Sequence, residues 1–351
     1  MRRVSSLLAV VALALAGAAP AARVAIRAAA PATVTVMTRN LYLGTSLDPI
    51  VKARSLEEGL RAVAAGWNEV QANDFPTRAR AIAAEIAAAK PDFVGFQEAV
   101  LYRTQTPSDF TIKPARDVAL DYVLELRKAF KERGLHYRFV GINPATDAEM
   151  PAGAPATMDV RITVRDALAV RITPRVKVLR VRRGLYTATK PLIGGLVIAR
   201  RGWVSADARV GGRTIRVITT HLESFDRPVQ EAQSEELLRR PAATRLPAVL
   251  LGDLNSRPDG STTKSYANMT AGGFRDAWAQ AYPGQAGLTC CHGDDLRAIG
   301  GPFYERIDYV LVRGGFRALR GRVTGEAAAT RAGGLWPSDH GGLWMTLRLP
   351  R

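Results

Sequence analysis

Polar and apolar residues alternate in short runs along most of the chain, and a few runs are wholly apolar. Alternation, as in Thr33–Thr38, is typical of a half-buried β-strand, whereas a short apolar run such as Ala248–Leu251 is typical of a fully buried strand. We predict further strands at Asp92–Phe96, Tyr137–Gly141, Asp159–Val164, Ala167–Ile172, Gly195–Ala199, Ala208–Val210, Thr214–Thr219, Ile307–Arg313 and Leu343–Leu349.

Helical patterns are fewer than the strands. Pro76–Lys90 is rich in alanine and is followed by Pro91, and Asp117–Arg133 and Glu231–Arg240 are also predicted to be helical. A doubly wound sheet would need a helix for almost every strand. We therefore predict an α/β fold in which two mixed sheets pack face to face and helices flank each of them.

The N-terminus has the pattern of a secretory signal peptide. Arg2 and Arg3 precede a short apolar stretch over Val4–Ala19, and small residues lie near its end. A membrane-spanning helix needs about 20 apolar residues, and Arg23 and Arg27 follow too closely. We predict a signal peptide at residues 1–30, a catalytic domain over 31–351 and export from the cell. An uncleaved membrane anchor is the alternative.

Composition narrows the class of protein. The chain has 351 residues, of which 47% are hydrophobic and 23% charged, which excludes collagen-like and fully disordered chains. Length alone allows two domains or one large one. The net charge of +17 falls to +13 if residues 1–30 are removed. An acidic partner is one explanation of this remaining positive charge. The other is compositional, because 41 of the 49 basic residues are arginine.

The two cysteines, Cys290 and Cys291, are adjacent and cannot close a long loop. A vicinal disulfide, two free thiols and pairing between chains all stay open. His292 and Asp294 lie next to them, but the further ligands of a metal cluster are missing at the usual spacing. We interpret this segment as a local turn.

Candidate catalytic residues lie where predicted strands end. Asp253 and Asn255 follow Ala248–Leu251, and strand alternation directs residues two apart to the same side. His221 ends another strand, and further strand ends deliver Asn40 and Gln97-Glu98. Ser338-Asp339-His340 precedes the last strand. One such residue is more often structural than functional, but this number of polar strand ends predicts a common site.

These residues, in this order, resemble the endonuclease/exonuclease/phosphatase family, which includes deoxyribonuclease I. The matching motifs are Thr38-Arg39-Asn40, Gln97-Glu98, Thr220-His221-Leu222, Gly252-Asp253-Leu254-Asn255, Arg306-Ile307-Asp308-Tyr309 and Ser338-Asp339-His340. The resemblance covers about residues 33–350. It implies a four-layered α/β-sandwich and favours one catalytic domain over two.

The resemblance also implies a metal site. Glu98 is similar to the principal Mg²⁺ ligand of the family, with Asn40 and Asp339 completing a site that is largely filled by water. Oxygen ligands and retained water are what Mg²⁺ prefers, and Mn²⁺ or Ca²⁺ are alternatives.

Catalytic roles follow from the same resemblance. His340 corresponds to the general base or electrostatic partner at the phosphorus, and Asp308 to the carboxylate that orients its imidazole. Asp253 and Asn255 correspond to residues that orient the attacking water and the phosphate. His221 corresponds to a donor to a phosphoryl oxygen or to the leaving group.

Two segments depart from the family pattern. The 36 residues between Asn40 and Thr77 are longer than the usual connection and contain a predicted helix with Ser55 as N-cap and Glu58 at the capping-box position. This segment either walls the substrate cleft or packs as a surface helix. Asp166 stands where relatives carry a D-G-x-A-like strand, with Ala167 in place of glycine, and we assign it no role.

Together these features predict a secreted Mg²⁺-dependent phosphoester hydrolase, first of all a phosphodiesterase or nuclease. The basic charge favours nucleic acid. A sphingomyelinase-like phospholipid hydrolase is an alternative supported by export and by Leu335-Trp336 near Ser338, and an inositol-phosphate phosphatase is another. A catalytically silent binding module conflicts with the intact set of acidic residues and histidines. We expect a monomer with no stable protein partner.

Overall fold

A computed structural model describes residues 32–298 and 303–350 of the chain, so the leader predicted at residues 1–30 lies outside the described residues. One large mixed sheet contains eight strands in the order β15-β16-β1-β2-β6-β3-β4, with β5 paired to β6. Its strands are β1 (Thr33–Asn40), β2 (Phe93–Gln97), β3 (Leu101–Gln105), β4 (Asp117–Asp121), β5 (Tyr137–Ala152), β6 (Met158–Arg171), β15 (Arg317–Thr324) and β16 (Gly342–Arg348).

The second sheet has six strands in the order β13-β14-β12-β11-β10-β7. They are β7 (Val176–Leu185), β10 (Gly202–Val210), β11 (Arg213–His221), β12 (Ala248–Asp253), β13 (Arg275–Asp276) and β14 (Asp308–Arg313). A separate two-stranded hairpin joins β8 (Lys190–Leu192) to β9 (Val197–Ala199) through the 3-10 turn Ile193–Gly195.

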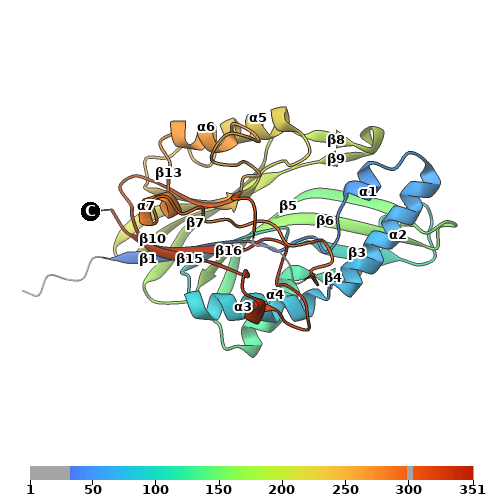
Figure 1. Cartoon of the computed structure of the whole chain (residues 1–351), viewed down its shortest axis with the longest axis horizontal. Helices are drawn as coiled ribbons and strands as arrows, with labels where there is room; N and C mark the ends of the chain where they lie inside the picture. Colours follow the sequence, from blue (N-terminus) through green and yellow to red (C-terminus); the bar gives the residue numbers. More distant parts are fainter. Residues whose placement is uncertain (1–31, 299–302, 351) are drawn as a thin grey trace, which may run out of the picture. The chain divides into compact units, whose positions relative to one another are not determined.

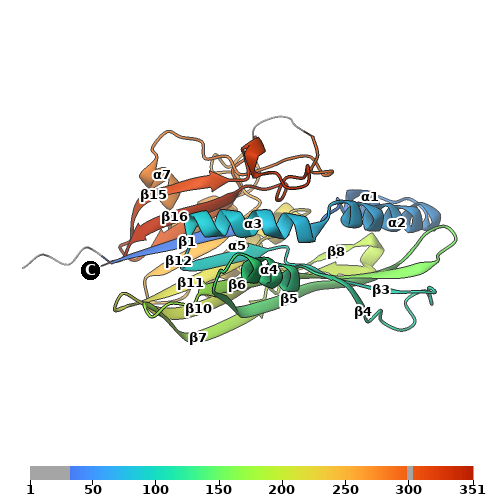
Figure 2. The ribbon, with the colours of Figure 1, turned by 90° about the horizontal axis from the view of Figure 1, so that it is seen from below.

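Helices cover the outer face of each sheet. Figure 1 shows α3 and α4 on one side of the strands and α5 and α6 on the other, and Figure 2 shows α1 and α2 beyond the end of α3. The helices are α1 (Asp48–Val51), α2 (Leu56–Ala72), α3 (Phe75–Ala89), α4 (Tyr122–Glu132), α5 (Arg227–Arg239), α6 (Ser265–Ala271) and α7 (Ala277–Ala281), with a 3-10 turn at Ala328–Thr330. The predicted four-layered α/β-sandwich with two packed mixed sheets is confirmed.

Strand alternation separates the core into layers. On β12, Val249 and Leu251 face the space between the sheets, whereas Leu250 packs with the helices outside the second sheet. On β1, Val36 belongs to the layer between the sheets and Met37 to the layer under α3 and α4. This two-sided burial explains why β12 is a nearly continuous apolar run.

The two sheets approach closely near the ends of β2 and β11. A Cβ atom at Gly95 would lie 2.5 Å from Thr219 Oγ1, so only glycine fits there. Next to it, the buried Gln97 amide donates to Thr219 Oγ1 (2.9 Å) and accepts from Thr38 Oγ1 (3.1 Å). Polar side chains therefore connect the sheets directly beneath the strand ends.

Several predicted boundaries were wrong. Asp117–Arg133 begins as strand β4 and becomes helix α4 only at Tyr122, because the Asp121 side chain caps that helix by accepting from Val123 N and Leu124 N. The separate strands predicted at Asp159–Val164 and Ala167–Ile172 are one strand, β6, which pairs along its length with an equally extended β5.

Other elements gave no clear signal in the sequence. Strands β3, β7 and β15 were not predicted, and the strand predicted at Gly195–Ala199 begins only at Val197. The exposed faces of β7 and β15 carry many arginines, which hides their alternation. Among residues 32–298 and 303–350, no helix is long and apolar enough to cross a membrane.

Candidate active site

Sheet topology brings the predicted site residues to one edge of the sandwich. β1 and β2 are parallel, and so are β11 and β12, so Asn40, Glu98, His221 and Asp253 all lie at carboxyl ends of strands. β14 runs antiparallel to β12 and begins at that edge, which pairs Asp308 with Asp253 in the register. The loop before β16 delivers Asp339 and His340 to the same place because β16 is antiparallel to β1.

Asn40 and Glu98 form one side of this site. Asn40 is fully buried, and its Nδ2 donates to Glu98 Oε1 and to Asp253 Oδ2, each at 3.1 Å. Glu98 Oε2 also accepts from Leu43 N at 2.7 Å. The amide of Asn40 therefore bridges the carboxylates from the two sheets and fixes both.

The donors around Glu98 fit a hard divalent cation. Burial and the neighbouring carboxylate of Asp339 raise the pKa of Glu98, since two carboxylates placed together disfavour ionisation. A cation between them would relieve that repulsion. Carboxylate and amide oxygens are the ligands that Mg²⁺ uses together with water, so Glu98 and Asp339 can hold such an ion. Asn40 Oδ1 already accepts from Tyr42 N at 2.9 Å, so this amide would reach the ion through its remaining lone pair. Asp253, Asp308 and His340 form a second grouping with potential ligand atoms within 4.8 Å of one another.

His340 is held by a carboxylate at one ring nitrogen. Its Nδ1 lies 2.8 Å from Asp308 Oδ2, which also accepts from Thr289 Oγ1 at 2.7 Å. Burial lowers the pKa of His340, but the carboxylates of Asp308 and Asp339 outweigh it and raise that pKa well above its usual value. These carboxylates favour the protonated imidazole, and its Nε2 faces Asp253 Oδ2 at 3.8 Å.

Asp253 lies between the two histidines of the site. Its Oδ2 is 3.5 Å from His221 Nε2, and its Oδ1 accepts from Asn255 N at 2.8 Å. Burial, followed by the charge of Asp308, raises the pKa of Asp253 to about 7. The Asn255 side chain lies beside His221, with Asn255 Nδ2 and His221 Nε2 separated by 3.1 Å. The structure thus brings together all of the residues that the sequence proposed as catalytic.

His221 remains neutral. Burial, together with the positive charge of Arg201, lowers its pKa well below the usual value. Arg201 NH1 lies 3.0 Å from His221 Nδ1. A guanidinium and an amide nitrogen can only donate, so Arg201 and Asn255 present donors to Nδ1 and Nε2 of His221 respectively. Nε2 also faces the carboxylate of Asp253 at 3.5 Å.

Strained backbone accompanies this geometry. Tyr42, Glu98 and Asn255 adopt left-handed conformations, with φ of 59°, 55° and 48°. Such positions cost non-glycine residues about 1–3 kcal/mol each and concentrate at functional sites. At Glu98, the left-handed turn ends the pairing of β2 and leaves the carboxylate between Asn40 and Leu43 N.

Sequence reasoning missed several residues of this site. Arg201 precedes β10 and contacts His221, and its Nε lies 3.6 Å from Glu223 Oε2. Asp166, to which the sequence assigned no role, is buried, and that burial raises its pKa well above the usual value. Asp166 occupies the D-G-x-A-like position but lacks its glycine, whereas Arg201 lies in no motif, and a lone arginine in an arginine-rich chain gives no signal.

Arg78 is a further missed residue, and it fixes the loops around the site. It is fully buried in α3. Its guanidinium donates to the carbonyl oxygens of Asn73 (2.9 Å), Leu41 (2.7 Å) and Pro337 (3.1 Å). The loops that follow Asn40 and precede Asp339 are therefore tied to one side chain. An apolar helical face would have been the expected environment for that position.

The adjacent cysteines lie beside His340. Cys290 and Cys291 are joined by a disulfide, and Cys290 Sγ is 3.9 Å from His340 Nε2. The backbone of Cys290 forms isolated antiparallel β-bridges with Glu305 and with His340. His292 stacks on Trp336 with 3.9 Å between ring centroids, so it packs in the loop layer and does not face the cysteines as a metal ligand would.

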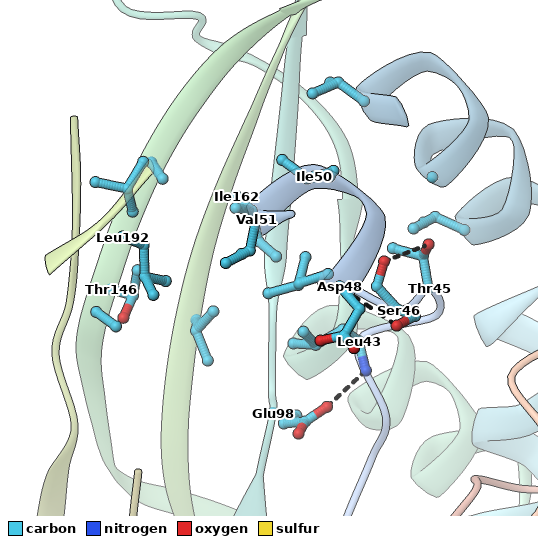
Figure 3. Close-up of a pocket in the computed structure, with 18 of the residues that line it drawn as sticks. Leu43, Thr45, Ser46, Asp48, Ile50, Val51, Glu98, Thr146, Ile162 and Leu192 are labelled. Carbon is cyan, nitrogen blue, oxygen red and sulfur yellow. Dashed lines mark hydrogen bonds between the residues drawn. The ribbon is translucent and has the colours of Figure 1, made fainter. Parts of the chain in front are cut away.

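The segment between Asn40 and α3 forms one wall of a cavity next to Glu98. Ser55 caps α2 by accepting from Glu58 N at 3.1 Å, as predicted, and Glu58 accepts in turn from Arg54 N. The cavity has a volume of about 300 Å³. Figure 3 shows Ile50 and Val51 of this segment facing Ile162 of β6, with Glu98 below them. Residues of this segment therefore line the cavity, and its role as the wall of a substrate cleft stays a prediction.

Comparison with known proteins identifies the family. The model of the Endonuclease/Exonuclease/phosphatase family matches residues 63–340, and the chain belongs to that family. Its members are phosphoester hydrolases that generally depend on a divalent metal ion. A search of curated protein sequences found no match.

Solved structures share the fold at low sequence identity. A family protein from Beutenbergia cavernae is 21% identical, with a TM-score of 0.56 over 91% of this chain and 72% of the other. A mannosyl-6-phosphatase from Bacteroides thetaiotaomicron is 14% identical, with a TM-score of 0.55 over 90% of this chain and 100% of the phosphatase. TDP2 from D. rerio, complexed with a single-strand DNA product, is 17% identical. Its TM-score is 0.53 over 90% of this chain and 99% of the TDP2 chain.

Proposed function

We propose that this protein is an exported, Mg²⁺-dependent phosphodiester hydrolase. Family membership supports phosphoester hydrolysis. The observation that supports the catalytic assignment most directly is the position of His340. One ring nitrogen contacts Asp308 at 2.8 Å, and the other faces Asp253 at 3.8 Å, beside the carboxylates of Glu98 and Asp339.

Glu98, Asp339 and Asn40 would hold the ion. When bound, Mg²⁺ supplies charge neutralisation on the phosphate and stabilises developing negative charge. Asn40 keeps the Glu98 carboxylate in place through its 3.1 Å hydrogen bond. The two carboxylates could also bind Mn²⁺ or Ca²⁺, so the metal preference is tested by replacing Mg²⁺ with each of these ions in the assay.

Asp253 and His340 would have different catalytic roles because their charges differ. The pKa of Asp253, raised to about 7, suits a group that accepts a proton from an attacking water near neutral pH. The protonated His340 would donate to a phosphoryl oxygen, with Asp308 holding its orientation. Asp253 and His340 are close enough to contact the same phosphate and water.

His221 and Asn255 would orient the phosphate. Arg201 contacts Nδ1 of His221, so Nε2 is the ring nitrogen that would contact a phosphoryl oxygen or the leaving group. Asn255 presents its amide beside the same nitrogen. Both groups remain neutral, so they add directed hydrogen bonds without further charge.

Hydrolysis of bis(p-nitrophenyl) phosphate by the purified protein tests this proposal. We expect turnover with Mg²⁺, none in EDTA, and recovery when Mg²⁺ is restored. Mn²⁺ and Ca²⁺ are assayed in parallel. His340→Ala should abolish turnover, whereas His136→Ala, which removes an exposed histidine, should not. Metal-independent turnover or an active His340→Ala variant would contradict the mechanism.

A panel of natural phosphoesters extends the test. Plasmid DNA, RNA, sphingomyelin and inositol phosphates cover the predicted substrate classes. Nucleic acid is the second candidate, favoured by the net charge of +13 that the chain has without residues 1–30, and its hydrolysis should weaken steeply with salt. Release of inorganic phosphate from inositol phosphates would instead indicate a phosphomonoesterase.

We also propose that residues 1–30 direct export and that the mature protein is a monomer. Expression of the full chain in a bacterial host should yield active protein outside the cytoplasm with a new N-terminus near residue 31. An unprocessed N-terminus in the membrane fraction would favour the anchor. Size-exclusion chromatography with light scattering measures the oligomeric state.

A further inference from the structure

We propose that the cavity beside Glu98 binds a hydrocarbon chain of the substrate, so that the enzyme acts on phosphodiesters bearing a single aliphatic chain. This inference rests on the proposed function, because it places the phosphate at the Glu98–Asp339 centre. It follows from the shape, lining and position of the cavity.

We call the cluster at the strand ends the polar centre; its residues are Asn40, Glu98, His221, Asp253, Asp308, Asp339 and His340. The cavity opens directly from it, because Glu98 and Asp339 belong to both. The charged residues of its lining are Glu98, Asp339, Arg201, Asp48 and Asp294, and the rest of the lining is mainly apolar. A phosphate held at Glu98 and Asp339 would thus have an ester substituent pointing into an apolar space. The cavity volume of about 300 Å³ lies at the lower end of the range for small-molecule sites, roughly 300–1,000 Å³. A cavity of this size suits one hydrocarbon chain better than two.

Apolar side chains line the cavity from separate parts of the fold. Ile50 comes from α1 and Trp67 from α2, Met150 and Ile162 come from the paired strands β5 and β6, and Leu192 comes from the β8–β9 hairpin. In Figure 3, Leu192 lies on the wall opposite Ile50 and Val51, with Ile162 between them. These contacts would remove a chain from water on several sides, and that burial supplies binding energy.

Three uncharged polar side chains of the lining already have partners. Thr45 Oγ1 donates to Glu69 Oε2 at 2.6 Å, and Thr146 Oγ1 donates to Arg200 O at 2.9 Å. The Tyr102 hydroxyl donates to Leu43 O at 3.0 Å. A nucleobase needs hydrogen bonds to its edge when it enters a pocket, and these side chains are engaged within the protein. The lining therefore favours a hydrocarbon over a base.

Exposed apolar residues continue the cavity lining outward. Leu196 is 84% exposed at the turn of the β8–β9 hairpin, between Ile193 and Val197, which both line the cavity. Phe225, another lining residue, is 38% exposed. A chain leaving the cavity would thus pass apolar groups, as expected where an aliphatic substrate enters.

A chain-length series tests this inference. Methyl, butyl, octyl and dodecyl p-nitrophenyl phosphates are assayed with Mg²⁺ below their aggregation limits. We expect kcat/KM to rise about fourfold for each methylene that enters the cavity, the gain expected from burying a CH₂ group, and then to level off. A flat series, or a higher kcat/KM for thymidine 5′-p-nitrophenyl phosphate than for the octyl ester, would overturn the proposal.

Cavity-filling variants assign the effect to this site. Ala148→Phe on β5 and Val51→Phe on α1 narrow the cavity from different walls. We expect the ratio of kcat/KM for the octyl and methyl esters to fall at least about tenfold in each. Ala243→Phe, at an exposed position after α5, is the matched control and should keep the wild-type ratio. An unchanged ratio in both folded variants would contradict the proposal.

Binding separates this inference from the proposed function. If no diester is hydrolysed, the proposed function fails, but calorimetry of methyl and octyl phosphate still measures the cavity. Tighter binding of octyl phosphate, lost in Ala148→Phe, would support the inference without any turnover. Equal binding of the two phosphates to the wild-type protein would overturn it.

Discussion

The polar centre and the apolar cavity meet at Glu98, yet different parts of the chain form them. Strand ends from both sheets supply the polar centre, and the register fixes their positions, as in the pairing of Asp253 with Asp308. Loops, a hairpin and an inserted helix supply the cavity. The comparison teaches that the rigid sheets place the phosphate chemistry, while the added segments determine what is attached to the phosphate. The following predictions test that division, from the largest expected effect to the smallest.

Removal of a principal residue of the polar centre should have the largest effect. We expect His340→Ala to lower kcat about 10²–10⁴-fold, the usual contribution of a positioned acid or base. The loss should be the same for the methyl and octyl esters, because His340 does not line the cavity. A chain-length dependence of the loss would break the division between the two regions.

Glu98→Ala should abolish the response to Mg²⁺. The carboxylate accepts from Asn40 and Leu43 N, and no other side chain in the described site takes its place between them. We expect a drop of at least about 100-fold in kcat/KM and a weaker affinity for Mg²⁺ by calorimetry. Glu235→Ala, at an exposed position on α5, is the control. Unchanged metal affinity would exclude Glu98 as a ligand.

Asp308→Asn should act through His340. The amide keeps a similar shape but removes the charge that raises the pKa of His340, so we expect that pKa to fall and activity to drop about 10–100-fold. If protonated His340 is the active form, activity should be lost at a lower pH on the alkaline side than in the wild type. A kcat/KM–pH profile measures this limb, and an unshifted limb would mean that Asp308 has only a structural role.

Arg201 touches both regions, so its replacement sharpens the comparison. It contacts His221 in the polar centre and also lines the cavity. We expect Arg201→Ala to lower kcat/KM about tenfold, the loss of one charge-assisted hydrogen bond. The loss should be equal for short and long esters if its role is to orient His221. The neighbouring exposed Arg200→Ala is the matched control.

The smallest effect should come from the wall of the cavity. Ser55→Ala removes the cap of α2, which should cost about 1 kcal/mol of unfolding free energy. Thermal denaturation measures this loss. We expect the methyl ester to be hydrolysed at the wild-type rate, because Ser55 is exposed at the far end of α2 from Glu98 and takes no part in the site. A large loss of activity would show that the wall also positions the polar centre.

Local pattern predicted much of the frame. The strand at Thr33–Thr38 and the helix at Pro76–Lys90 match β1 and α3 closely, because local alternation marks the strand and the alanine-rich stretch before Pro91 marks the helix. The pattern failed at Asp117–Asp121, where a side-chain cap begins α4 later than its composition suggests. It also failed on β7, whose exposed basic residues mask the strand period.

The sequence by itself determined the order of motifs and thereby the family, since each polar residue directly follows a strand whose apolar pattern is local. It also located the candidate residues Glu98, Asp253 and His340. Tertiary structure alone decided that Arg201 faces His221, that Arg78 ties two loops together, and that Ile50 faces Ile162 across a cavity. Those contacts join residues far apart in the chain through sheet packing and loop paths, which no local pattern records.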